Sequence, residues 1–355
     1  MRVLQVIDSL EVGGAEKVAI NMSILLSNQR HISVSFLCLL NKAKLDDELI
    51  KNNIEILYLK RPNKFHIKSV IRLYKILNQF DIIHVHSRHV LRYVSLTHFL
   101  PSFFKTFKVV FHDHYGNIEN DNRLNNYLRF CINNCKAYIG VSNNLLLWAK
   151  ENNIKVPLFL LSNIILKNKI DDITIKTNTI IVVGNFRKQK NYEFLIDLLS
   201  NLPTNIKVDI YGQPVDLLYY EFILKLIHQR DLADRVQIIT DVKNVLPLLN
   251  NYVMALHCAK SETGPLVCIE YLQKKLPFVM FETGEVAKQI KSITNKLLID
   301  SFDKKQWQIQ ILKIISDKNY RNQVVNDMNL IYKNYYSEEK YLDKCLKIYE
   351  HILSS

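Results

Sequence analysis

Short apolar runs alternate with segments of helical periodicity along almost the whole chain, and this alternation limits the possible folds more than any other feature. The first run, residues 3–8, is followed by a turn at residues 9–14 that ends in two glycines, and then by a helical segment at residues 15–27. A strand, a glycine-rich turn and a helix in this order begin a βαβ unit. Continuously apolar strands are typical of a parallel sheet that helices cover on both faces.

A second series of the same kind follows a polar segment, so the pattern predicts two α/β domains. The expected strands lie at residues 31–40, 54–59, 82–86, 108–112 and 137–141 in the first series and at residues 179–183, 207–211, 236–240 and 252–257 in the second. The expected helices lie at residues 67–79, 124–134, 192–199, 217–230, 243–250, 266–273, 303–317, 320–335 and 338–352. We expect an N-terminal domain at residues 1–164, a linker at residues 165–178, a second domain at residues 179–335 and a last helix at residues 336–355.

The composition fits two folded domains. Of the 355 residues, 48% are hydrophobic and 23% are charged, a balance that is typical of globular proteins with a buried core. No apolar run reaches the length of a membrane span, and Met1 leads directly into the first expected strand, so we expect a cytoplasmic protein. The six cysteines include no Cys-x-x-Cys pair and are expected to be buried free thiols.

Positive charge is concentrated in the N-terminal half. Residues 1–170 hold 23 Lys and Arg against 12 Asp and Glu, a net +11, whereas residues 171–355 hold 24 against 22, a net +2. Such a field can attract nucleic acid, an anionic membrane surface or a phosphate-bearing substrate. The abundance of Lys, Asn and Ile suggests genome bias as another source, but that bias does not explain why one half alone is unbalanced.

The segment at residues 91–108 is both aromatic and basic. It includes the aromatic residues Tyr93, Phe99, Phe103, Phe104 and Phe107 and the cations Arg92, Lys105 and Lys108. About half of these side chains must belong to the core, because aromatic cores are common. The remainder can lie at a membrane interface, where aromatic rings embed and basic side chains meet anionic headgroups.

The densest group of functional residue types stands at residues 261–270, Ser-Glu-Thr-Gly-Pro-Leu-Val-Cys-Ile-Glu. Glu262 and Glu270 lie eight positions apart, across a loop that enters a helix. Pro265 suits the first helical position, Gly264 lets the backbone approach a ligand, and the first turn offers N–H groups to an anion. Backbone amides can bind a phosphate, and the two carboxylates can bind sugar hydroxyls, so this segment predicts a nucleotide-sugar site. The spacing of the two glutamates alone also suits a solvated helix face.

Residues 276–279, Leu-Pro-Phe-Val, and residues 283–285, Thr-Gly-Glu, follow this pair. Together with Glu262-x7-Glu270 they resemble the C-terminal motif of the family-4 glycosyltransferases. The resemblance spans nearly the whole chain and implies retaining enzymes of the GT-B class, an α/β fold with two Rossmann-like, doubly wound domains that face a central cleft. It also implies that the last helix returns to the first domain. Residues 262–265, Glu-Thr-Gly-Pro, depart from the family's Glu-Gly-Phe-Gly, which can change the fit around the donor sugar.

The resemblance implies which residues bind the donor. Glu262 is expected at the sugar hydroxyls and Glu270 at the ribose. The first loop, Gly13-Gly14-Ala15-Glu16, resembles the family's first loop, although a simple Gly-Gly turn is the alternative. This loop lacks both the GxGxxG and the Walker patterns, so neither a nicotinamide cofactor nor a P-loop NTPase is supported. The expected donor-binding residues in these loops and in the following helix are Gly13, Gly14, Gly264, Pro265, Leu266, Val267 and Glu270.

The loop at residues 184–191, Gly-Asn-Phe-Arg-Lys-Gln-Lys-Asn, places three cations before a helix, where a diphosphate can bind. The family pattern at this place is Gly-Arg followed by a lysine. Gly184 and Lys190 match this pattern, but Asn185 occupies the position of the arginine. We predict that Arg187 supplies the missing guanidinium, with a solvated basic turn as the alternative.

Histidines end two expected strands of the first domain. Residues 84–89 read His-Val-His-Ser-Arg-His, and residues 111–116 read Phe-His-Asp-His-Tyr-Gly. A zinc site is one interpretation, but neither a His-Glu-x-x-His motif nor a cysteine partner supports it. By resemblance, His112 faces the donor sugar, where an imidazole can bind a hydroxyl or a developing charge, and His86 holds a less direct position.

Arg88, Asp113 and His114 are the candidates for the acceptor side. They stand at the carboxyl ends of expected parallel strands, where α/β sheets bind their ligands. Histidines that merely cap strands are the alternative for most of these positions.

We therefore predict a retaining glycosyltransferase that moves a hexose-type sugar from a nucleoside-diphosphate sugar to a hydroxyl of a glycan or lipid-linked glycan. The resemblance places such a reaction in capsule, lipopolysaccharide or exopolysaccharide synthesis. The expected catalytic residues are Glu262, His112, Lys190 and Arg187. The chain contains no Asp-x-Asp, so we expect no metal and no other cofactor, with the cations stabilising the diphosphate instead.

Other functions remain open at this point. An epimerase or a phosphorylase acting on related substrates can use the same fold, and the departures at Asn185 and Gly264-Pro265 also allow an inactive scaffold. The basic N-terminal half is also compatible with a nucleic-acid-binding protein. The sequence contains no known nucleic-acid recognition module, so we do not expect nucleic acid as a partner. The expected partners are the nucleotide sugar, the acceptor and an anionic membrane surface at the inner face of the plasma membrane.

Overall fold

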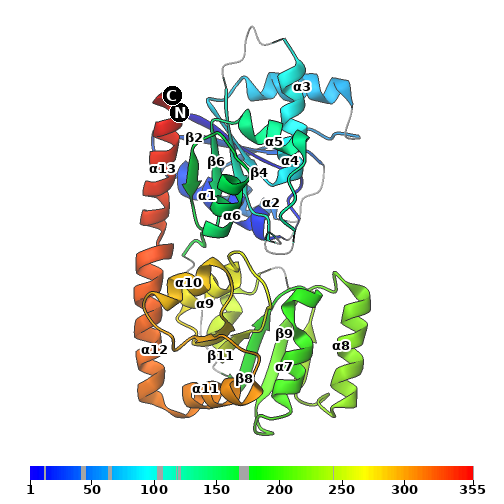
Figure 1. Ribbon diagram of the computed structural model, residues 1–355, viewed down its shortest axis with the longest axis vertical. Coiled ribbons are helices and arrows are strands. Elements are labelled where there is room, and N and C mark those ends of the chain that lie inside the picture. Colours follow the sequence, from blue (N-terminus) through cyan, green and yellow to red (C-terminus); the bar gives the residue numbers. More distant parts are fainter. Residues whose placement is uncertain are drawn as a thin grey trace. The chain divides into compact units, whose positions relative to one another are not determined.

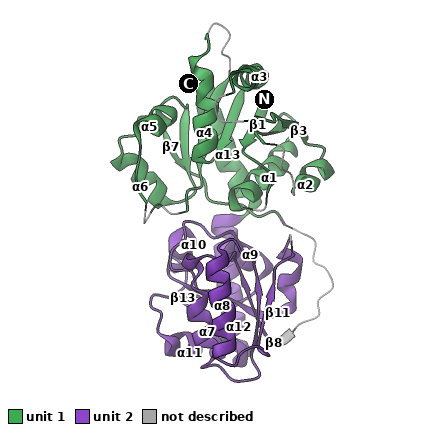
Figure 2. Ribbon diagram, turned by 90° about the vertical axis from the view of Figure 1, so that its right-hand side faces the viewer, with its two compact units in different colours: residues 1–166, 337–355 green, residues 167–336 purple. Residues whose placement is uncertain are grey.

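The computed structural model describes residues 1–11, 13–40, 45–62, 66–101, 107–116, 118, 121–167, 176–242 and 244–354. The chain forms two compact units, which Figure 2 distinguishes by colour. Unit 1 consists of Met1–Leu166 and Ser337–Ser355, and unit 2 consists of Lys167–Tyr336. Within the described residues, no helix combines the length and the apolar character that a bilayer span requires.

Unit 1 contains a seven-stranded sheet (Figure 1). Its strands are β1 (Arg2–Ile7), β2 (Ser33–Cys38), β3 (Glu55–Tyr58), β4 (Ile82–His86), β5 (Lys108–Asp113), β6 (Ala137–Gly140) and β7 (Leu158–Leu160). They stand in the order β3-β2-β1-β4-β5-β6-β7, and all of their pairings are parallel. The strand order reverses between β1 and β4, and sheets of this type bind ligands beyond the strand ends at such a reversal.

Helices cover this sheet, and polar side chains bind the backbone at the ends of some of them. The helices are α1 (Gly14–Ser27), α2 (Asp46–Lys51), α3 (Ile67–Leu77), α4 (Arg88–Val94), α5 (Asn126–Asn133), α6 (Asn143–Glu151), α13 (Glu338–Ser354) and the 3-10 helix η1 (Ser95–Phe99). The Asn125 side chain accepts from the N–H of Leu128 at 2.8 Å and so begins α5. At the end of α13, Lys108 Nζ donates to the carbonyls of Ile352 and Leu353 at 2.8 and 3.0 Å. This contact ties the last helix to β5.

Unit 2 contains a six-stranded parallel sheet. Its strands are β8 (Lys176–Val183), β9 (Lys207–Tyr211), β10 (Val236–Ile239), β11 (Tyr252–His257), β12 (Phe278–Phe281) and β13 (Leu298–Ile299). Its helices are α7 (Tyr192–Leu199), α8 (Leu217–Gln229), α9 (Leu266–Lys274), α10 (Gly284–Lys291), α11 (Lys304–Ser316), α12 (Lys318–Ile331), the 3-10 helices η2 (Lys188–Lys190) and η3 (Leu246–Asn251) and the π-helix η4 (Tyr332–Tyr336). The strand order β10-β9-β8-β11-β12-β13 reverses between β8 and β11.

The predicted fold class is confirmed, because both sheets are parallel and share the strand order of Rossmann-like domains. The strands at residues 82–86, 207–211 and 252–257 have the predicted bounds. Two local predictions were wrong. The helix expected at residues 243–250 is the shorter 3-10 helix η3, in which hydrogen bonds reach three residues back, as from the Leu248 N–H to the carbonyl of Val245 at 2.9 Å. Pro265 is the residue before the first turn of α9, with an extended ψ of 112°, and not its first helical residue.

Two loops of unit 2 approach each other closely at Gly212, the residue that follows β9. A Cβ atom at this position would overlap the carbonyl oxygen of Gly184, the residue that follows β8. Hydrogen bonds hold the loops at this separation: Phe186 N–H donates to the carbonyl of Gln213 at 2.9 Å, and the Gln213 N–H donates to Asn185 Oδ1 at 3.0 Å. Gly212 therefore lets the loop after β8 keep its place.

We expect the substitution Gly212→Ala to lower the free energy of unfolding by roughly 1–3 kcal/mol, because the new methyl group meets backbone that cannot move aside. Gly13→Ala is the matched control. A Cβ at Gly13 would meet only the flexible end of the Glu16 side chain, and the φ of −157° at Gly13 suits any residue. The measurement is the urea midpoint of each variant, and equal midpoints for the two would contradict the expectation.

Candidate active site

The predicted donor-binding loops of unit 2 begin at the reversal of its strand order. The loop at residues 184–191 follows β8, and the loop at residues 258–265 follows β11, the strand that pairs with β8. Because the strands are parallel neighbours, both loops leave the sheet at the same edge. The Lys260 N–H donates to the carbonyl of Gln189 at 2.8 Å, so the loops also contact each other directly.

This contact brings together Lys190 and Glu262, two of the residues predicted to be catalytic. Lys190 Nζ donates a close hydrogen bond to Glu262 Oε1, and the two groups form an ion pair. Their side chains are 18% and 12% exposed, which leaves each one a small accessible surface. Gly184 leaves space for the Lys190 side chain, because a Cβ atom at residue 184 would lie 3.2 Å from Lys190 Cε.

The charge state of this pair follows from its surroundings. Burial by itself would raise the pKa of Glu262, but Lys190 and the nearby His257 outweigh this effect and lower that pKa to about 2. His257 Nε2 lies 3.5 Å from Glu262 Oε1. Burial also lowers the pKa of His257, and the attraction of Glu262 offsets this only in part. At neutral pH the site therefore holds an ionised carboxylate, a cation and a neutral imidazole.

The start of α10 holds the Glu262 loop in place. The Glu262 N–H donates to Thr283 Oγ1 at 3.3 Å, and the Glu285 N–H donates to the carbonyl of Thr263 at 2.8 Å. Gly284 has a φ of 75°, and a Cβ there would overlap the carbonyl oxygen of Glu262. The residues at 283–285 thus have a physical role, because they fix the backbone that carries the first carboxylate.

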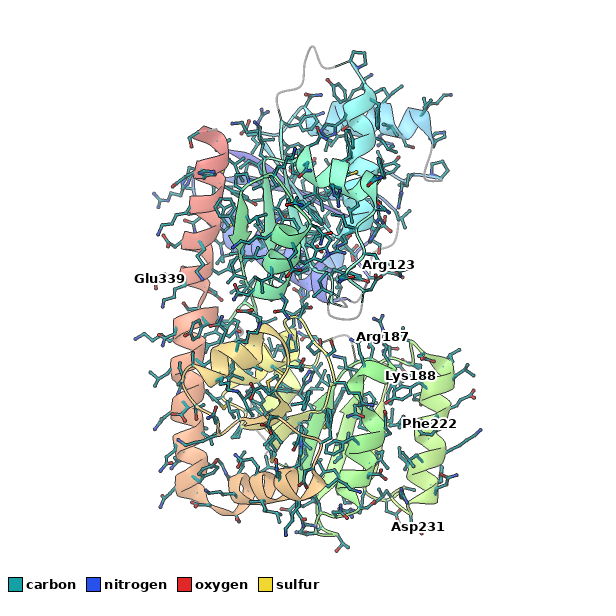
Figure 3. The ribbon with its side chains drawn as sticks, in the orientation of Figure 1. Arg123, Arg187, Lys188, Phe222, Asp231 and Glu339 are labelled. Atoms are coloured by element: carbon teal, nitrogen blue, oxygen red, sulfur yellow. The ribbon has the colours of Figure 1, made fainter. Side chains whose placement is uncertain are left out.

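The remaining donor-side predictions fall on different parts of these loops. Arg187 is exposed, and Figure 3 labels it beside Lys188 on the loop that leads into α7. The Asn185 side chain is used inside the fold, since its Oδ1 accepts from Gln213. Glu270 lies on α9 and is 4% exposed. Gly264, Pro265, Leu266 and Val267 form the turn into α9, while Gly13 and Gly14 form the start of α1 in unit 1.

A face of the unit 1 sheet carries four histidines in an array. His84 and His86 are alternate residues of β4, and His112 pairs in register with His86 from β5, with His114 two positions further along. His84 Nε2 lies 3.1 Å from His112 Nδ1, and His86 Nδ1 lies 3.0 Å from His114 Nε2. Because side chains alternate along a strand, the four rings occupy the same face.

Burial makes these imidazoles neutral. His84, His86 and His112 are fully buried, and burial, with repulsion among the rings, lowers the pKa of each one well below its ordinary value. Burial of the ring lowers the pKa of His114 to about 3, although its residue surface is partly exposed. In the part of the chain that the structure describes, the first three form a group whose nitrogens lie within 4.8 Å of one another, as metal ligands could. Most of these nitrogens are instead engaged in hydrogen bonds within the protein.

Arg88 and Asp113, predicted on the acceptor side, form an enclosed ion pair. Arg88 Nη2 lies 2.8 Å from Asp113 Oδ2, and the carboxylate is fully buried. The Tyr138 hydroxyl donates to the same oxygen at 3.0 Å, and the guanidinium lies 4.2 Å from the ring centroids of both Tyr115 and Trp148. This packing does not favour direct contact of Asp113 with an acceptor, because no part of its carboxylate reaches the surface. It indicates a pair that stabilises the end of β5.

A second polar group, which was not predicted from the sequence, lies at the carboxyl ends of the strands of unit 1. Asp8 follows β1, and Arg61 Nη2 lies 2.6 Å from its Oδ1, while His89 Nε2 lies 3.6 Å from its Oδ2. Ser87 Oγ lies 3.2 Å from His89 Nδ1. Asp8 and His89 are 23% and 58% exposed, so this group presents polar atoms at the strand-order reversal. The signal was present in the sequence, since Asp8 is the first polar residue after an apolar strand.

Two parallel sheets of Rossmann order, with a cation and an ionised carboxylate at the reversal of the second sheet, fit the class of GT-B glycosyltransferases. Comparison with known families agrees with this class. The family "Glycosyltransferase Family 4" matches residues 12–157, and the family "Glycosyl transferases group 1" matches residues 167–329. The chain belongs to the group 1, family-4 glycosyltransferases. The resemblance stated from the sequence is thereby confirmed. No curated protein matches the chain at a significant level.

Solved structures with low sequence identity share the fold over the whole chain. HepE from Anabaena, in complex with UDP and glucose, has a TM-score of 0.79 at 15% identity and covers 100% of both chains. A TarM variant from S. aureus, in complex with UDP and other ligands, has a TM-score of 0.77 at 12% identity and also covers 100% of both chains. The lipopolysaccharide outer core galactosyltransferase WaaB has a TM-score of 0.69 at 14% identity and covers 98% of this chain and 99% of its own.

Because of the buried histidines, we expect the protein to lose stability on acidification at a pH well above the range in which carboxylates titrate. Below pH 6.5 the unfolded chain binds protons at His84, His86 and His112, and the folded chain does not, so stability falls as the pH falls. For three such groups the loss between pH 6.5 and 5.5 is on the order of 3 kcal/mol. The contribution of Glu262 has the same sign but is lost only below its ordinary pKa of 4.5. Urea midpoints measured across this interval test the expectation, and a constant midpoint would contradict it.

Proposed function

We propose that this glycosyltransferase moves a hexose-type sugar from a nucleoside-diphosphate sugar to a hydroxyl group, with retention at the anomeric carbon. The observation that carries the proposal is the pair of Lys190 and Glu262, which places a fixed cation beside an ionised carboxylate at the start of α9. HepE, which shares the fold, has been solved with UDP-glucose. We propose uridine as the base for this reason.

In the proposed reaction, the groups of unit 2 stabilise the charge that develops on the leaving diphosphate. Lys190 and the exposed Arg187 supply positive charge, and the turn of residues 264–267 supplies the N-terminus of α9. Glu262 accepts hydrogen bonds from the sugar hydroxyls, and Glu270 from the ribose. Lys190 can donate further hydrogen bonds, because its ammonium group carries three N–H groups and Glu262 accepts from one of them.

The bond changes balance without a covalent enzyme intermediate. The acceptor oxygen attacks the anomeric carbon from the face that the diphosphate leaves, so a C–O bond to the acceptor forms while the C–O bond to the phosphate breaks. The proton of the acceptor hydroxyl passes to the departing phosphate oxygen. His112 contributes from the sugar side as a hydrogen-bond partner. We propose that no metal takes part, because the sequence lacks Asp-x-Asp and the cations can carry the phosphate charge.

Substitutions in unit 2 test this assignment. We expect Glu262→Gln and Lys190→Met each to lower kcat for sugar transfer by at least about 100-fold, because each removes a charge aimed at the reacting groups. Lys188→Ala is the matched control, since Lys188 is exposed on the same loop. Transfer is measured with UDP-sugars, with and without EDTA, on variants whose circular dichroism matches that of the wild type. Full activity of both variants, or strict dependence on an added metal, would sink the assignment.

We propose that the acceptor is a lipid-linked glycan and that unit 1 contacts an anionic membrane, at the inner face of the plasma membrane. The rings of Phe99, which is 68% exposed, and of Tyr127 each stack against Phe130, with ring centroids 6.0 and 6.5 Å away. Exposed aromatic rings on a basic domain are typical of a surface that binds the headgroup region of an anionic membrane. Of the predicted aromatic segment, Tyr93 and Phe107 belong instead to the core, and Phe103, Phe104 and Lys105 lie outside the described residues.

Liposome binding tests the membrane contact. We expect the double substitution Phe99→Ser with Phe130→Ser to weaken binding to phosphatidylglycerol vesicles at least about fivefold, because two rings no longer enter the interface. Leu218→Ser is the control, since Leu218 is 81% exposed but lies on α8 of unit 2. Wild-type binding should also fall as salt rises. A wild-type protein that does not bind these vesicles even at low salt would end the proposal.

A further inference from the structure

The polar group of Asp8, Ser87 and His89 lies where the strand order of unit 1 reverses. Asp8 follows β1, and Ser87 and His89 follow β4, the parallel neighbour of β1 across the reversal. The carboxylate that was expected to face the acceptor, that of Asp113, is fully buried, whereas the side chains of Asp8 and His89 are 23% and 58% exposed. A ligand in solution can therefore reach Asp8 and His89.

Two atoms of this group are separated by a distance that suits a shared partner. Asp8 Oδ2 and His89 Nε2 lie 3.6 Å apart, which is too far for a direct hydrogen bond. A single oxygen atom beside them can still lie about 2.8 Å from both. Because a carboxylate can only accept, that oxygen must donate to Asp8, and it can accept from an N–H at His89 Nε2.

Arg61 keeps Asp8 ionised and in place. Arg61 Nη2 donates to Asp8 Oδ1 at 2.6 Å, so Oδ2 is the oxygen on the side of His89. The guanidinium of Arg61 lies 4.6 Å from the ring centroid of Tyr93, which holds it from the other side. Burial by itself would raise the pKa of Asp8, but His89 and Arg61 outweigh this effect and lower that pKa.

Ser87 adopts a strained backbone conformation next to His89. Its φ of 73° and ψ of 149° lie close to a region that glycine populates and serine rarely enters. Its N–H donates to the carbonyl of His112 at 3.3 Å, and its own carbonyl accepts from the Leu91 N–H at 3.2 Å, so both sides of the residue are held. Its Oγ lies 3.2 Å from His89 Nδ1. Strain of this kind is concentrated at ligand-binding and active sites, and here the strained residue contacts the imidazole.

The hydrogen-bond requirement selects the class of ligand. A hydroxyl group can donate and accept at the same time, whereas the oxygens of an ionised phosphate or carboxylate cannot donate to Asp8. Glu16 interacts electrostatically with Asp8, with Glu11 and with His89, so further carboxyl groups lie near the same place. These groups disfavour an anionic ligand and leave a neutral, hydroxylated one.

We infer that Asp8 and His89 bind a hydroxyl group of a neutral sugar in the acceptor glycan, and that Ser87 is the positioning residue that holds His89 for this contact. The inference deepens the proposed function and rests on it for the presence of a glycan acceptor. It assigns a sugar, and not the phosphate of a lipid-linked acceptor, to the carboxyl ends of β1 and β4. Loss of this contact should raise KM for the acceptor and leave the use of the donor unchanged.

Transfer kinetics of the full-length protein test the contact. The donors are UDP-glucose, UDP-galactose and UDP-N-acetylglucosamine, and the neutral acceptors are the methyl glycosides of glucose, galactose, mannose and N-acetylglucosamine. Methyl glucuronide is the anionic acceptor. Hydrolysis of the donor in the absence of any acceptor is measured in parallel, because water replaces the acceptor in that reaction and needs no sugar subsite.

We expect transfer to at least one neutral glycoside and none to the glucuronide. Asp8→Asn and His89→Ala should each raise KM for the neutral acceptor at least about tenfold, without changing donor hydrolysis. The matched controls lie at the opposite, amino ends of the strands. They are Asp81→Asn, since Asp81 Oδ1 lies 3.5 Å from Arg2 Nη2 just before β4, and His31→Ala, since His31 is exposed just before β2.

Three results would overturn the inference. They are equal acceptor KM in variants and controls, transfer to the glucuronide as efficient as to the neutral glycosides, and a protein that hydrolyses a donor but transfers to no neutral glycoside. A protein that neither hydrolyses a donor nor transfers its sugar would contradict the proposed function itself, and the inference with it.

Two substitutions that both remove the hydroxyl of Ser87 test its role. At most positions alanine gives a more stable protein than glycine, because glycine has more freedom in the unfolded chain. At Ser87 we expect the reverse, a higher urea midpoint for Ser87→Gly than for Ser87→Ala, because only glycine relaxes the positive φ. Both variants should raise the acceptor KM at least about threefold, since His89 loses its partner. A higher midpoint for Ser87→Ala would contradict the strain, and an unchanged acceptor KM would contradict the positioning role.

Discussion

The ion pair of Lys190 and Glu262 is the interaction on which the loops of unit 2 depend. A carboxylate that is 12% exposed stays ionised only beside a compensating cation, and the loops after β8 and β11 bring that cation to it. Much of the surrounding backbone serves this contact. Gly184 leaves space for the lysine, Gly212 leaves space for the loop that carries it, and Gly284 leaves space for the backbone of Glu262. The three glycines thus supply the space that this one charge pair requires.

Unit 1 differs from unit 2, because its sheet buries a group of histidines in the neutral state. Its three fully buried histidines are neutral, and hydrogen bonds join them to one another, to Gln5 and to Tyr349. The charges near the same edge are paired separately, with Arg88 against Asp113 and Arg61 against Asp8. A neutral array adds no net charge of its own at the carboxyl ends of β4 and β5.

Much of the architecture could be predicted from the sequence, because apolar runs and helical periodicity are local properties. The interior strands β4, β9 and β11 were predicted with their bounds, since nearly all of their residues are buried and most of these are apolar or aromatic. The strands β7 and β13 were not predicted, because they are short edge strands whose sequences carry little pattern. At the site, the sequence pointed to Lys190 and Glu262 as members of motifs, and the structure showed that they form one ion pair.

The sequence by itself determined the fold class, the family and the residue types available at the strand ends. The tertiary structure decided which of those residues work together. The tertiary structure brings Tyr349 to His84 although the two residues lie 265 positions apart along the chain, and no local pattern in the sequence could predict this contact. It also showed that Asp113 is enclosed with Arg88 and does not reach the surface. The physical reason is that protonation states and hydrogen-bond directions depend on burial and on neighbours, and only the folded chain supplies these.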